Sequence, residues 1–343
     1  MMELKRTRFG TLAGGENVDL FTLKAGNIQL SISELGAAWT ELLVPDSRGA
    51  CDDVILGFST LSPYTNNVPF FGATMGRYAN RISGASFPLN DKQYTLYANN
   101  GANTLHGGRR GFDKKLWHGE EYKKDGNIFV HFELVSPDGE EGFPGHLHAE
   151  VNYGLSQSGE VIAEYNAKVD KNCPVNLTNH AYFNLSGEGS GSILQHEVKL
   201  FSSSYLEVDN NRIPTGRLLP VKETPFDFTE RKVIGRDLAA VGGAYDYCWK
   251  VDGQSGSLRP AAEVFDPASG RTMSVFTTQP GVQFYTGNSL DNTAGKLGSV
   301  YKKHSGFCLE TQHFPDSPNR KEFPSAIFGP EREYHEKTIF VFS

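Results

Sequence analysis

Three runs between residues 128 and 169 alternate apolar with polar or mixed side chains, beginning with Ile128-Phe129-Val130-His131-Phe132-Glu133-Leu134. The second run extends from Leu147 to Leu155 and the third from Val161 to Val169. A period of two is that of a β-strand, whose side chains point to alternate faces. Turn-forming residues separate the runs, as Ser136-Pro137-Asp138-Gly139 and Ser156-Gln157-Ser158-Gly159. The pattern predicts three consecutive strands in an antiparallel meander.

The remainder of the chain of 343 residues shows the same preference for strands. Residues Ile28 to Ile32 form a further strand pattern, and 37 glycines supply turns. The only helix candidate is Thr229 to Ala240, with Thr229 as a possible N-cap. We see no linker and no internal repeat. We therefore predict an all-β chain, a large antiparallel β-sandwich with few short helices, forming a single domain over residues 1–343.

Charge and composition limit the classes of partner. The chain has 33 Lys+Arg against 40 Asp+Glu, a net charge of -7, which argues against nucleic acid and anionic membranes as partners. No apolar run approaches the ~20 residues of a membrane span, and the charged start lacks the apolar core of a signal peptide. These features predict a cytoplasmic protein, with a monomer as the default. The four cysteines have no metal-binding spacing, so we expect them to be reduced and mostly buried.

The stretch Asn176-Leu177-Thr178-Asn179-His180-Ala181-Tyr182-Phe183-Asn184-Leu185 has a polar, histidine-bearing pattern. Interpreted as one strand, it places Leu177, Ala181, Phe183 and Leu185 on an apolar face. The opposite face then carries Asn176, Thr178, His180, Tyr182 and Asn184. A strand anchored by one apolar face and rich in hydrogen-bonding groups on the other can present a rigid site to a polyhydroxylated ligand.

Two later strands repeat this arrangement. In residues 281–286, Val282 and Phe284 point one way, so Gln283 is expected to be displayed on the other face. In residues 306–312, Glu310 stands in an otherwise apolar strand. A carboxylate in that setting is costly unless it is paired or used. Glu310 is therefore the natural acid/base partner for His180, provided that both strands face one cleft.

Three loops add polar candidates. His106 precedes the pair Gly107-Gly108, whose glycines allow left-handed angles or a close backbone approach. Asn80 and Arg81 offer donors suited to sugar hydroxyls. Asp246, flanked by two tyrosines, could accept hydrogen bonds from a diol while a ring packs on the apolar face of a sugar.

Each candidate also has a structural interpretation. A single histidine in a strand is more often a hydrogen-bonded structural residue than a catalyst. A metal site formed by His106, His180 and Glu310, or by the pair His146 and His148, lacks the spacing that would make it convincing, so no metal is predicted. A paired-carboxylate hydrolase would need two acidic residues flanking one bond, whereas the best carboxylate here is matched with a histidine.

Taken together, the motifs resemble those of the galactose mutarotases, or aldose 1-epimerases. They occur in that family's order from about Phe70 to Asn319, as Asn80-Arg81-Ile82, Leu105-His106-Gly107-Gly108, Thr178-Asn179-His180-Ala181-Tyr182-Phe183-Asn184-Leu185, Tyr245-Asp246, Gln283-Phe284-Tyr285-Thr286-Gly287-Asn288 and Glu310-Thr311-Gln312-His313-Phe314-Pro315-Asp316-Ser317-Pro318-Asn319. The resemblance implies a galactose mutarotase-like supersandwich with an open sugar cleft. It also implies an isomerase that interconverts the anomers of free hexoses such as D-galactose and D-glucose, without cofactor or metal.

By the same resemblance, Glu310 is similar to the general base, His180 to the general acid, and His106 to a residue that assists them. The substrate ligands it implies are Asn80, Arg81, His106, Tyr182, Asp246 and Gln283. One departure is visible at Tyr247, where relatives often carry histidine.

The chemistry of ring opening asks for one base and one acid. We expect Glu310 as a carboxylate and His180 as an imidazolium, with the pKa of the histidine at or above its reference of about 6.5. Other classes stay open, namely a carbohydrate-binding module, a glycoside hydrolase, and a hexose-6-phosphate epimerase. The last would need basic residues at the mouth of the cleft, for which Arg77, Arg109 and Arg110 are candidates.

Overall fold

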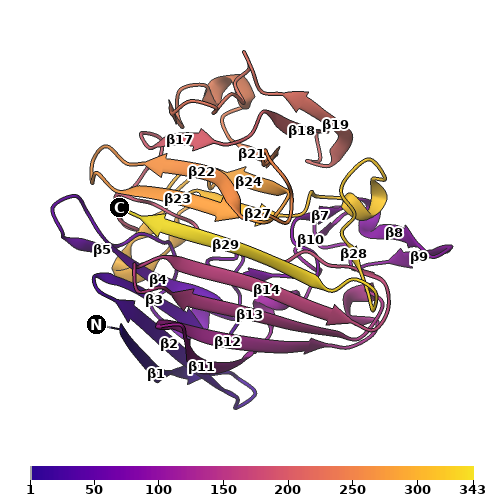
Figure 1. Ribbon diagram of the computed structural model, residues 1–343, viewed down its shortest axis with the longest axis horizontal. Coiled ribbons are helices and arrows are strands. Elements are labelled where there is room, and N and C mark those ends of the chain that lie inside the picture. The colour runs from indigo at the N-terminus through magenta and orange to yellow at the C-terminus, as the bar shows by residue number, and fades with distance from the viewer. Residues whose placement is uncertain (1) are drawn as a thin grey trace.

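The computed structural model describes residues 2–343, and its largest element is a nine-stranded antiparallel sheet (Figure 1). In spatial order its strands are β11 (His118–Lys124), β12 (Asn127–Ser136), β13 (Leu147–Leu155), β14 (Val161–Val169), β29 (Tyr334–Phe342), β23 (Thr272–Thr277), β22 (Arg259–Phe265), β17 (Glu197–Leu200) and β20 (Lys232–Val233). Strands β12, β13 and β14 pair in sequence order. The predicted antiparallel meander is confirmed.

The described chain also contains two five-stranded sheets (Figure 1). The N-terminal sheet consists of β1 (Met2–Thr11), β2 (Asn17–Ala25), β3 (Ile28–Ser33), β4 (Ala38–Pro45) and β5 (Cys51–Asp53). The other sheet has the spatial order β19 (Pro214–Pro220), β18 (Ser204–Val208), β21 (Asp246–Lys250), β24 (Gly281–Tyr285) and β27 (Cys308–Gln312). This second sheet carries Asp246, Gln283 and Glu310.

Short elements connect the sheets. The two-stranded pairs are β6 (Thr74–Met75) with β16 (Thr178–Asn179), β7 (Arg81–Ile82) with β10 (Thr104–Leu105), β8 (Ser86–Leu89) with β9 (Lys92–Thr95), β15 (Cys173–Pro174) with β28 (Ile327–Phe328), and β25 (Thr293–Ala294) with β26 (Val300–Tyr301). The helical segments are α1 (Leu61–Tyr64) and the 3₁₀ turns η1 (Ser83–Ala85), η2 (Phe112–Lys114), η3 (Glu140–Gly142), η4 (Leu238–Val241), η5 (Lys296–Gly298) and η6 (Ser317–Asn319). The predicted all-β sandwich with few short helices is confirmed.

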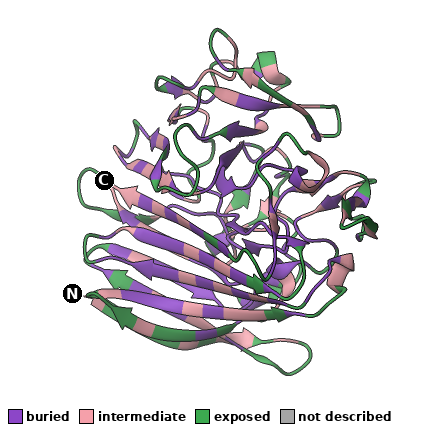
Figure 2. Cartoon of the chain, turned by 45° about the vertical axis from the view of Figure 1, so that its right-hand side comes forward, coloured by how far each residue is buried: buried purple, intermediate pink, exposed green. Residues whose placement is uncertain are grey.

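Aromatic side chains join the sheets into one core. Trp39 of β4 packs edge-on against Tyr153 of β13 and Phe340 of β29, with ring centroids 5.3 and 5.5 Å apart. Phe307, directly before β27, packs against Phe183, whose ring also meets Phe340. Burial accordingly alternates along the strands of the large sheet, with the buried residues facing the interior (Figure 2). This packing fixes the sheet that carries the polar candidates relative to the rest of the molecule.

The interpretation of residues 176–185 as one two-faced strand is wrong. Only Thr178–Asn179 forms a strand, and every residue of the segment is buried. Asn176 and Asn184 satisfy backbone carbonyls, those of Ala79 and Ser305 among them. The segment threads between other strands, so tertiary contacts on both sides replace the expected division into a core face and a polar face.

The predicted helix Thr229 to Ala240 is also wrong. The segment forms strand β20, then a turn through Gly235, and reaches only the 3₁₀ turn η4. The backbone N–H of Ile234 donates to the carbonyl of His196. Lys232 is buried, and its Nζ donates to the Pro225 carbonyl and to Asp237. Sheet pairing and this buried lysine outweigh the local preference for a helix.

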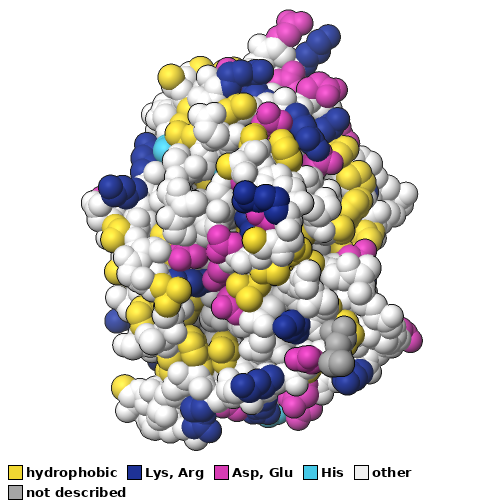
Figure 3. Space-filling model, turned by 90° about the vertical axis from the view of Figure 1, so that its left-hand side faces the viewer, with side chains coloured by type: hydrophobic (Ala, Val, Ile, Leu, Met, Phe, Trp, Pro, Cys, Tyr) yellow, Lys and Arg dark blue, Asp and Glu magenta, His cyan; other side chains and the backbone are white. Residues whose placement is uncertain are grey.

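The described chain has ordinary surface features. On the face shown in Figure 3, acidic and basic side chains are interspersed, without an extended basic patch. No helix within residues 2–343 is long and apolar enough to cross a membrane. The cysteines are free, and all but Cys51 are buried, as expected.

Candidate active site

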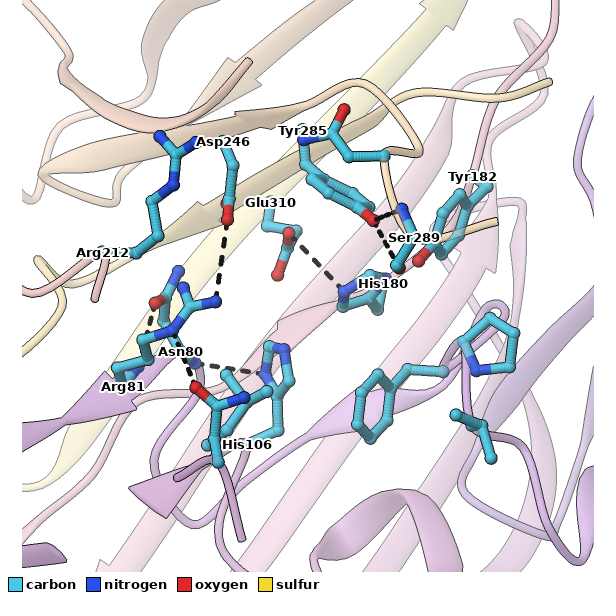
Figure 4. A pocket seen from close by; sticks show the side chains of 16 residues that line it. Asn80, Arg81, His106, His180, Tyr182, Arg212, Asp246, Tyr285, Ser289 and Glu310 are labelled. Carbon is cyan, nitrogen blue, oxygen red and sulfur yellow. Dashed lines mark hydrogen bonds and ion pairs between the residues drawn. The ribbon is translucent and has the colours of Figure 1, made fainter. Parts of the chain in front are cut away.

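A cavity of about 410 Å³ gathers most of the predicted site residues (Figure 4). It lies where the start of β21, the end of β24 and the middle of β27 meet the segments around residues 68–70, 80–81, 100–106 and 180–182. The lining side chains are Val68, Pro69, Phe70, Asn80, Arg81, Asn100, Leu105, His106, His180, Tyr182, Arg212, Asp246, Tyr285, Asn288, Ser289 and Glu310. Of the predicted residues, Gln283 alone is missing from the lining.

Strand register explains why the acidic residues meet. Gln283 of β24 lies directly opposite Glu310 of β27, and Asp246 starts the neighbouring strand β21. Gln283 is 3% exposed, so the expectation that it is displayed is wrong. Its Nε2 donates to Asp246 Oδ1 over 2.6 Å. Gln283 therefore orients Asp246 from behind instead of facing the cavity itself.

Arg81 contacts the other carboxylate oxygen of Asp246, the one that Gln283 does not bind. Its guanidinium lies 3.6 Å from Asp246 Oδ2, and its Nε donates to Asn100 Oδ1. Arg81 begins the short strand β7 and is paired in register with Leu105 of β10, the residue before His106. A guanidinium and a carboxylate thus lie side by side at one end of the cavity, where they can serve as donors and acceptors to neighbouring hydroxyl groups.

His180 contacts Glu310 at the centre of the cavity. Nε2 of His180 lies 3.7 Å from Oε1 of Glu310, and both side chains are almost fully buried (Figure 4). The histidine follows β16, which packs beside β27. Its ring also packs against the rings of Phe70, His106 and Tyr182, with centroids 5.1 to 5.7 Å away. One oxygen of Glu310, Oε2, is buried and has no hydrogen-bond partner among the described residues.

Burial sets the protonation of this pair. It raises the pKa of Glu310 to about 8, with a further rise from Asp246 and a smaller opposing effect of Arg81. It lowers the pKa of His180 to about 4, which its own backbone and Asp246 only partly offset. The expected pair of imidazolium and carboxylate is therefore wrong, because burial disfavours the charged form of both side chains. At neutral pH these shifts favour a neutral imidazole on His180 and a protonated carboxyl on Glu310.

His106 is held as a neutral donor. The backbone N–H of Asn80 donates to Nδ1 of His106 over 3.1 Å, and the backbone N–H of His106 donates to the Asn80 carbonyl. Burial, followed by the electrostatic effect of the basic side chains His180, Arg81 and Lys114, keeps the pKa of His106 well below its usual value. With Nδ1 accepting, the ring proton resides on Nε2. His106 can therefore donate a hydrogen bond to an oxygen in the cavity.

The glycines after His106 have the predicted conformation, with φ of 86° at Gly107 and 106° at Gly108. A Cβ on Gly107 would lie 1.9 Å from the carbonyl oxygen of Gly76. Gly107 thus allows its backbone to pack closely against the backbone of Gly76. This packing fixes the segment that carries His106.

The family model described as aldose 1-epimerase matches residues 19–341 of this chain. The chain belongs to the aldose 1-epimerase family. It is 45% identical to the galactose mutarotase of Homo sapiens, with 100% of this chain and 99% of the relative covered. It is 36% identical to the aldose 1-epimerase of Escherichia coli (strain K12), with 96% of each covered. The predicted family is confirmed.

A solved structure supports the same assignment. The GalM/aldose epimerase homologue from C. elegans is 28% identical to this chain and superimposes with a TM-score of 0.86, covering 93% of this chain and 97% of the other.

Some lining residues of this aldose 1-epimerase family member have no signal in the sequence. Phe70 has a φ of 63° and places its ring 4.8 Å from that of His106. Arg212, in the turn between β18 and β19, stacks its guanidinium over Tyr247 at 4.7 Å. Tyr285 could have been inferred, because it follows Gln283 in the strand by two residues. The other two come from turns, where no periodicity shows which way a side chain points.

His106, His180 and Glu310 lie close enough for one atom of each to reach a common metal ion. The other candidate pair is not a unit, because His148 lies instead beside Glu133 and Glu150. A metal bound by His106, His180 and Glu310 would occupy the space in which Glu310 and His180 can otherwise exchange protons with a ligand. The same donor set thus suits either a metal or acid/base chemistry, and a chelator experiment separates the two.

Proposed function

We propose that this protein is an aldose 1-epimerase that interconverts the α and β anomers of free hexoses such as D-galactose and D-glucose. Such an enzyme feeds the anomers of these sugars into hexose metabolism. The observation that carries the proposal is the buried Glu310–His180 pair, 3.7 Å apart, in a cavity of about 410 Å³ with polar groups around it. One shared proton between two groups is what a reversible proton exchange at a hemiacetal requires.

In the proposed reaction, Glu310 removes the proton of the C1 hydroxyl while His180 protonates the ring oxygen. The C1–O bond of the ring breaks and leaves an open-chain aldehyde. Rotation about the C1–C2 bond exposes the other face of the aldehyde. Reclosure with the proton transfers reversed gives the second anomer and restores both groups.

The proton must move from Glu310 to His180 before this step. A bound sugar favours the move, because its C1 hydroxyl can donate to the carboxylate and Arg81 already lowers the pKa of that group. The ring oxygen then accepts a hydrogen bond from the imidazolium. We propose that sugar binding establishes the productive charge state.

The remaining residues hold the sugar in this proposal. His106 donates from Nε2 to an oxygen near the reacting centre, with Asn80 fixing its ring through the 3.1 Å hydrogen bond. Arg81 and Asp246 bind neighbouring hydroxyls, and Gln283 orients Asp246. Tyr182, 2% exposed, provides a wall and packs on the ring of His180.

The other classes find less support. In a hydrolase, Asp246 would have to act on the scissile bond with Glu310, but Arg81 and Gln283 already engage both of its oxygens. For a 6-phosphate substrate, Arg77 is no ligand, because it is buried and donates to Ser136 and to the carbonyls of Pro137 and Pro144. A pure binding module would not need the buried acid/base pair.

Polarimetry of freshly dissolved α-D-galactose and α-D-glucose tests the proposal. We expect the protein to accelerate the approach to equilibrium for at least one sugar, in proportion to its concentration. A disaccharide such as lactose should remain uncleaved in a parallel sample. Sugar binding without acceleration would support the binding module, and release of monosaccharides would support a hydrolase.

We further propose that the enzyme works as a monomer in the cytoplasm. The net charge of -7 and the intact cavity within one chain support this proposal. Sedimentation at the concentration of the assay checks the monomer.

A further inference from the structure

Strand β27 contacts both nitrogens of the His180 ring. Cys308 and Glu310 are two residues apart on this strand and point to the same side. The Sγ of Cys308 lies 3.6 Å from Nδ1 of His180, and Oε1 of Glu310 lies 3.7 Å from Nε2. The imidazole therefore bridges two alternate side chains of one strand, and their spacing fixes its orientation.

We propose that Cys308 is a positioning residue, whose thiol holds Nδ1 of His180 and keeps Nε2 directed at Glu310 and the sugar. The inference rests on the proposed epimerase function and deepens it. Nδ1 would otherwise have no side-chain partner among the described residues near it. A ring that could rotate about its bond to Cβ would lose the alignment that proton transfer needs.

A thiol suits this position because it can both donate and accept a hydrogen bond. When His180 is neutral with its proton on Nε2, the S–H group donates to the free Nδ1. When His180 is an imidazolium, Nδ1 carries a proton and donates to the sulfur. The same side chain thus serves both states of the catalytic cycle. No water is needed, and both residues are buried, with Cys308 fully inaccessible.

The thiol remains protonated throughout. Burial, followed by the electrostatic effect of the acidic side chains Glu310 and Asp246, raises the pKa of Cys308 well above its usual value. The other titratable groups around His180 are His106 and the phenols of Tyr182 and Tyr285. Burial raises the pKa of both phenols, so neither supplies an anion that could replace the thiol. Cys308 is therefore a neutral partner and takes no part in covalent chemistry.

The competing explanation is that Cys308 only fills space. Three substitutions separate the two, namely Cys308→Ser, which keeps a donor and acceptor, Cys308→Val, which keeps approximate volume, and Cys308→Ala. We expect Val and Ala to lower kcat for galactose about tenfold with KM changed less than about twofold, and Ser to stay within about threefold of wild type. Thermal unfolding of each variant confirms that it is folded.

Cys173→Val is the matched control, because Cys173 is a buried cysteine whose sulfur contacts Arg77 and not His180. Its kcat should equal that of wild type. If Cys308→Val keeps the full kcat of an active wild type, the side chain acts only by packing and the inference is overturned. If wild type itself fails to accelerate either sugar, the proposed function falls, and the inference falls with it.

Discussion

Nε2 of His180 and Oε1 of Glu310 lie 3.7 Å apart, with side chains only 5% and 3% exposed. At this degree of burial the charged form of each group is disfavoured. Because burial moves their pKa values in opposite directions, to about 4 for His180 and about 8 for Glu310, one proton is held across the neutral range. The pH dependence of turnover follows from the number of protons that His180 and Glu310 hold together.

We expect kcat/KM for galactose to be bell-shaped in pH. Below about pH 4 both His180 and Glu310 are protonated, so no base remains; above about pH 8 both have lost their protons, so no acid remains. Initial rates by polarimetry over this range check the shape, after subtraction of the buffer-catalysed reaction. A rate that keeps rising well above pH 8 would argue against Glu310 as the holder of the proton.

Asp246→Asn should change both affinity and pH dependence. The carboxylate of Asp246 is, after burial, the largest contributor to the raised pKa of Glu310. Its removal should shift the alkaline limb of kcat/KM to lower pH and raise KM about tenfold, because a hydroxyl ligand is weakened. Arg81→Ala should raise KM and lower kcat, but shift that limb the opposite way. An alkaline limb that stays at the wild-type pH in both variants would contradict the effects of Asp246 and Arg81 on the pKa of Glu310.

His106 should behave as a donor without a titration of its own. We expect His106→Ala to lower kcat/KM by about 10² to 10³, because a hydrogen bond to a reacting oxygen is lost. His106→Gln, which keeps an amide donor, should recover part of the loss. Both limbs of the pH profile should remain where they are in wild type. Loss of the acidic limb in these variants would show that His106, and not His180, is the titrating histidine.

The strands of the large sheet could be predicted because the alternation of apolar and polar residues in their sequence matches the alternation of buried and partly buried residues in the structure. Val151 of β13 and its partner Tyr165 of β14 are buried. The next pair along the two strands, Asn152 and Glu164, is only partly buried. The segment around His180 could not be predicted in this way. Its neighbours lie on strands far away in sequence, so both of its faces are buried. The failed helix at residues 229–240 has the same origin, a backbone pairing invisible in the local pattern.

The site was predictable where a residue contradicts its surroundings. Glu310 stands out because it is a carboxylate among apolar residues. Phe70 and Arg212 do not stand out, since both come from turns. The charge state of His180 was also beyond the sequence, because it depends on how little water reaches the ring once Phe70 and Tyr182 cover it. Desolvation is a property of the assembled cavity.

Glu310→Gln should be more stable than wild type at alkaline pH. A carboxyl whose folded pKa is raised contributes stability that is complete below its unfolded pKa of 4.5 and is lost as the pH rises through about 8. The glutamine has no such dependence. The advantage of the variant should therefore grow across this window, to a few kcal/mol at roughly 1.4 kcal/mol per pH unit. His180 is present in both proteins, so its opposite contribution near pH 4 largely cancels. Urea unfolding at several pH values measures the difference, and a constant difference would contradict the raised pKa.

Removal of metal ions should leave activity unchanged. The reaction proposed for Glu310 and His180 uses only their protons, so dialysis against a chelator should not alter kcat. Added zinc should inhibit, because His106, His180 and Glu310 can converge on one ion and would then be withdrawn from the sugar. Activity that disappears with the chelator and returns with a metal would overturn the acid/base account.

The central claim is that Glu310 exchanges a proton with the sugar. Its most direct test is Glu310→Gln, which keeps the shape and removes the base, measured by polarimetry with α-D-galactose and by calorimetric titration of galactose binding. The account predicts a kcat at least about 10³-fold below wild type, with a dissociation constant within about threefold of wild type. A variant that turns galactose over at the wild-type rate would contradict it.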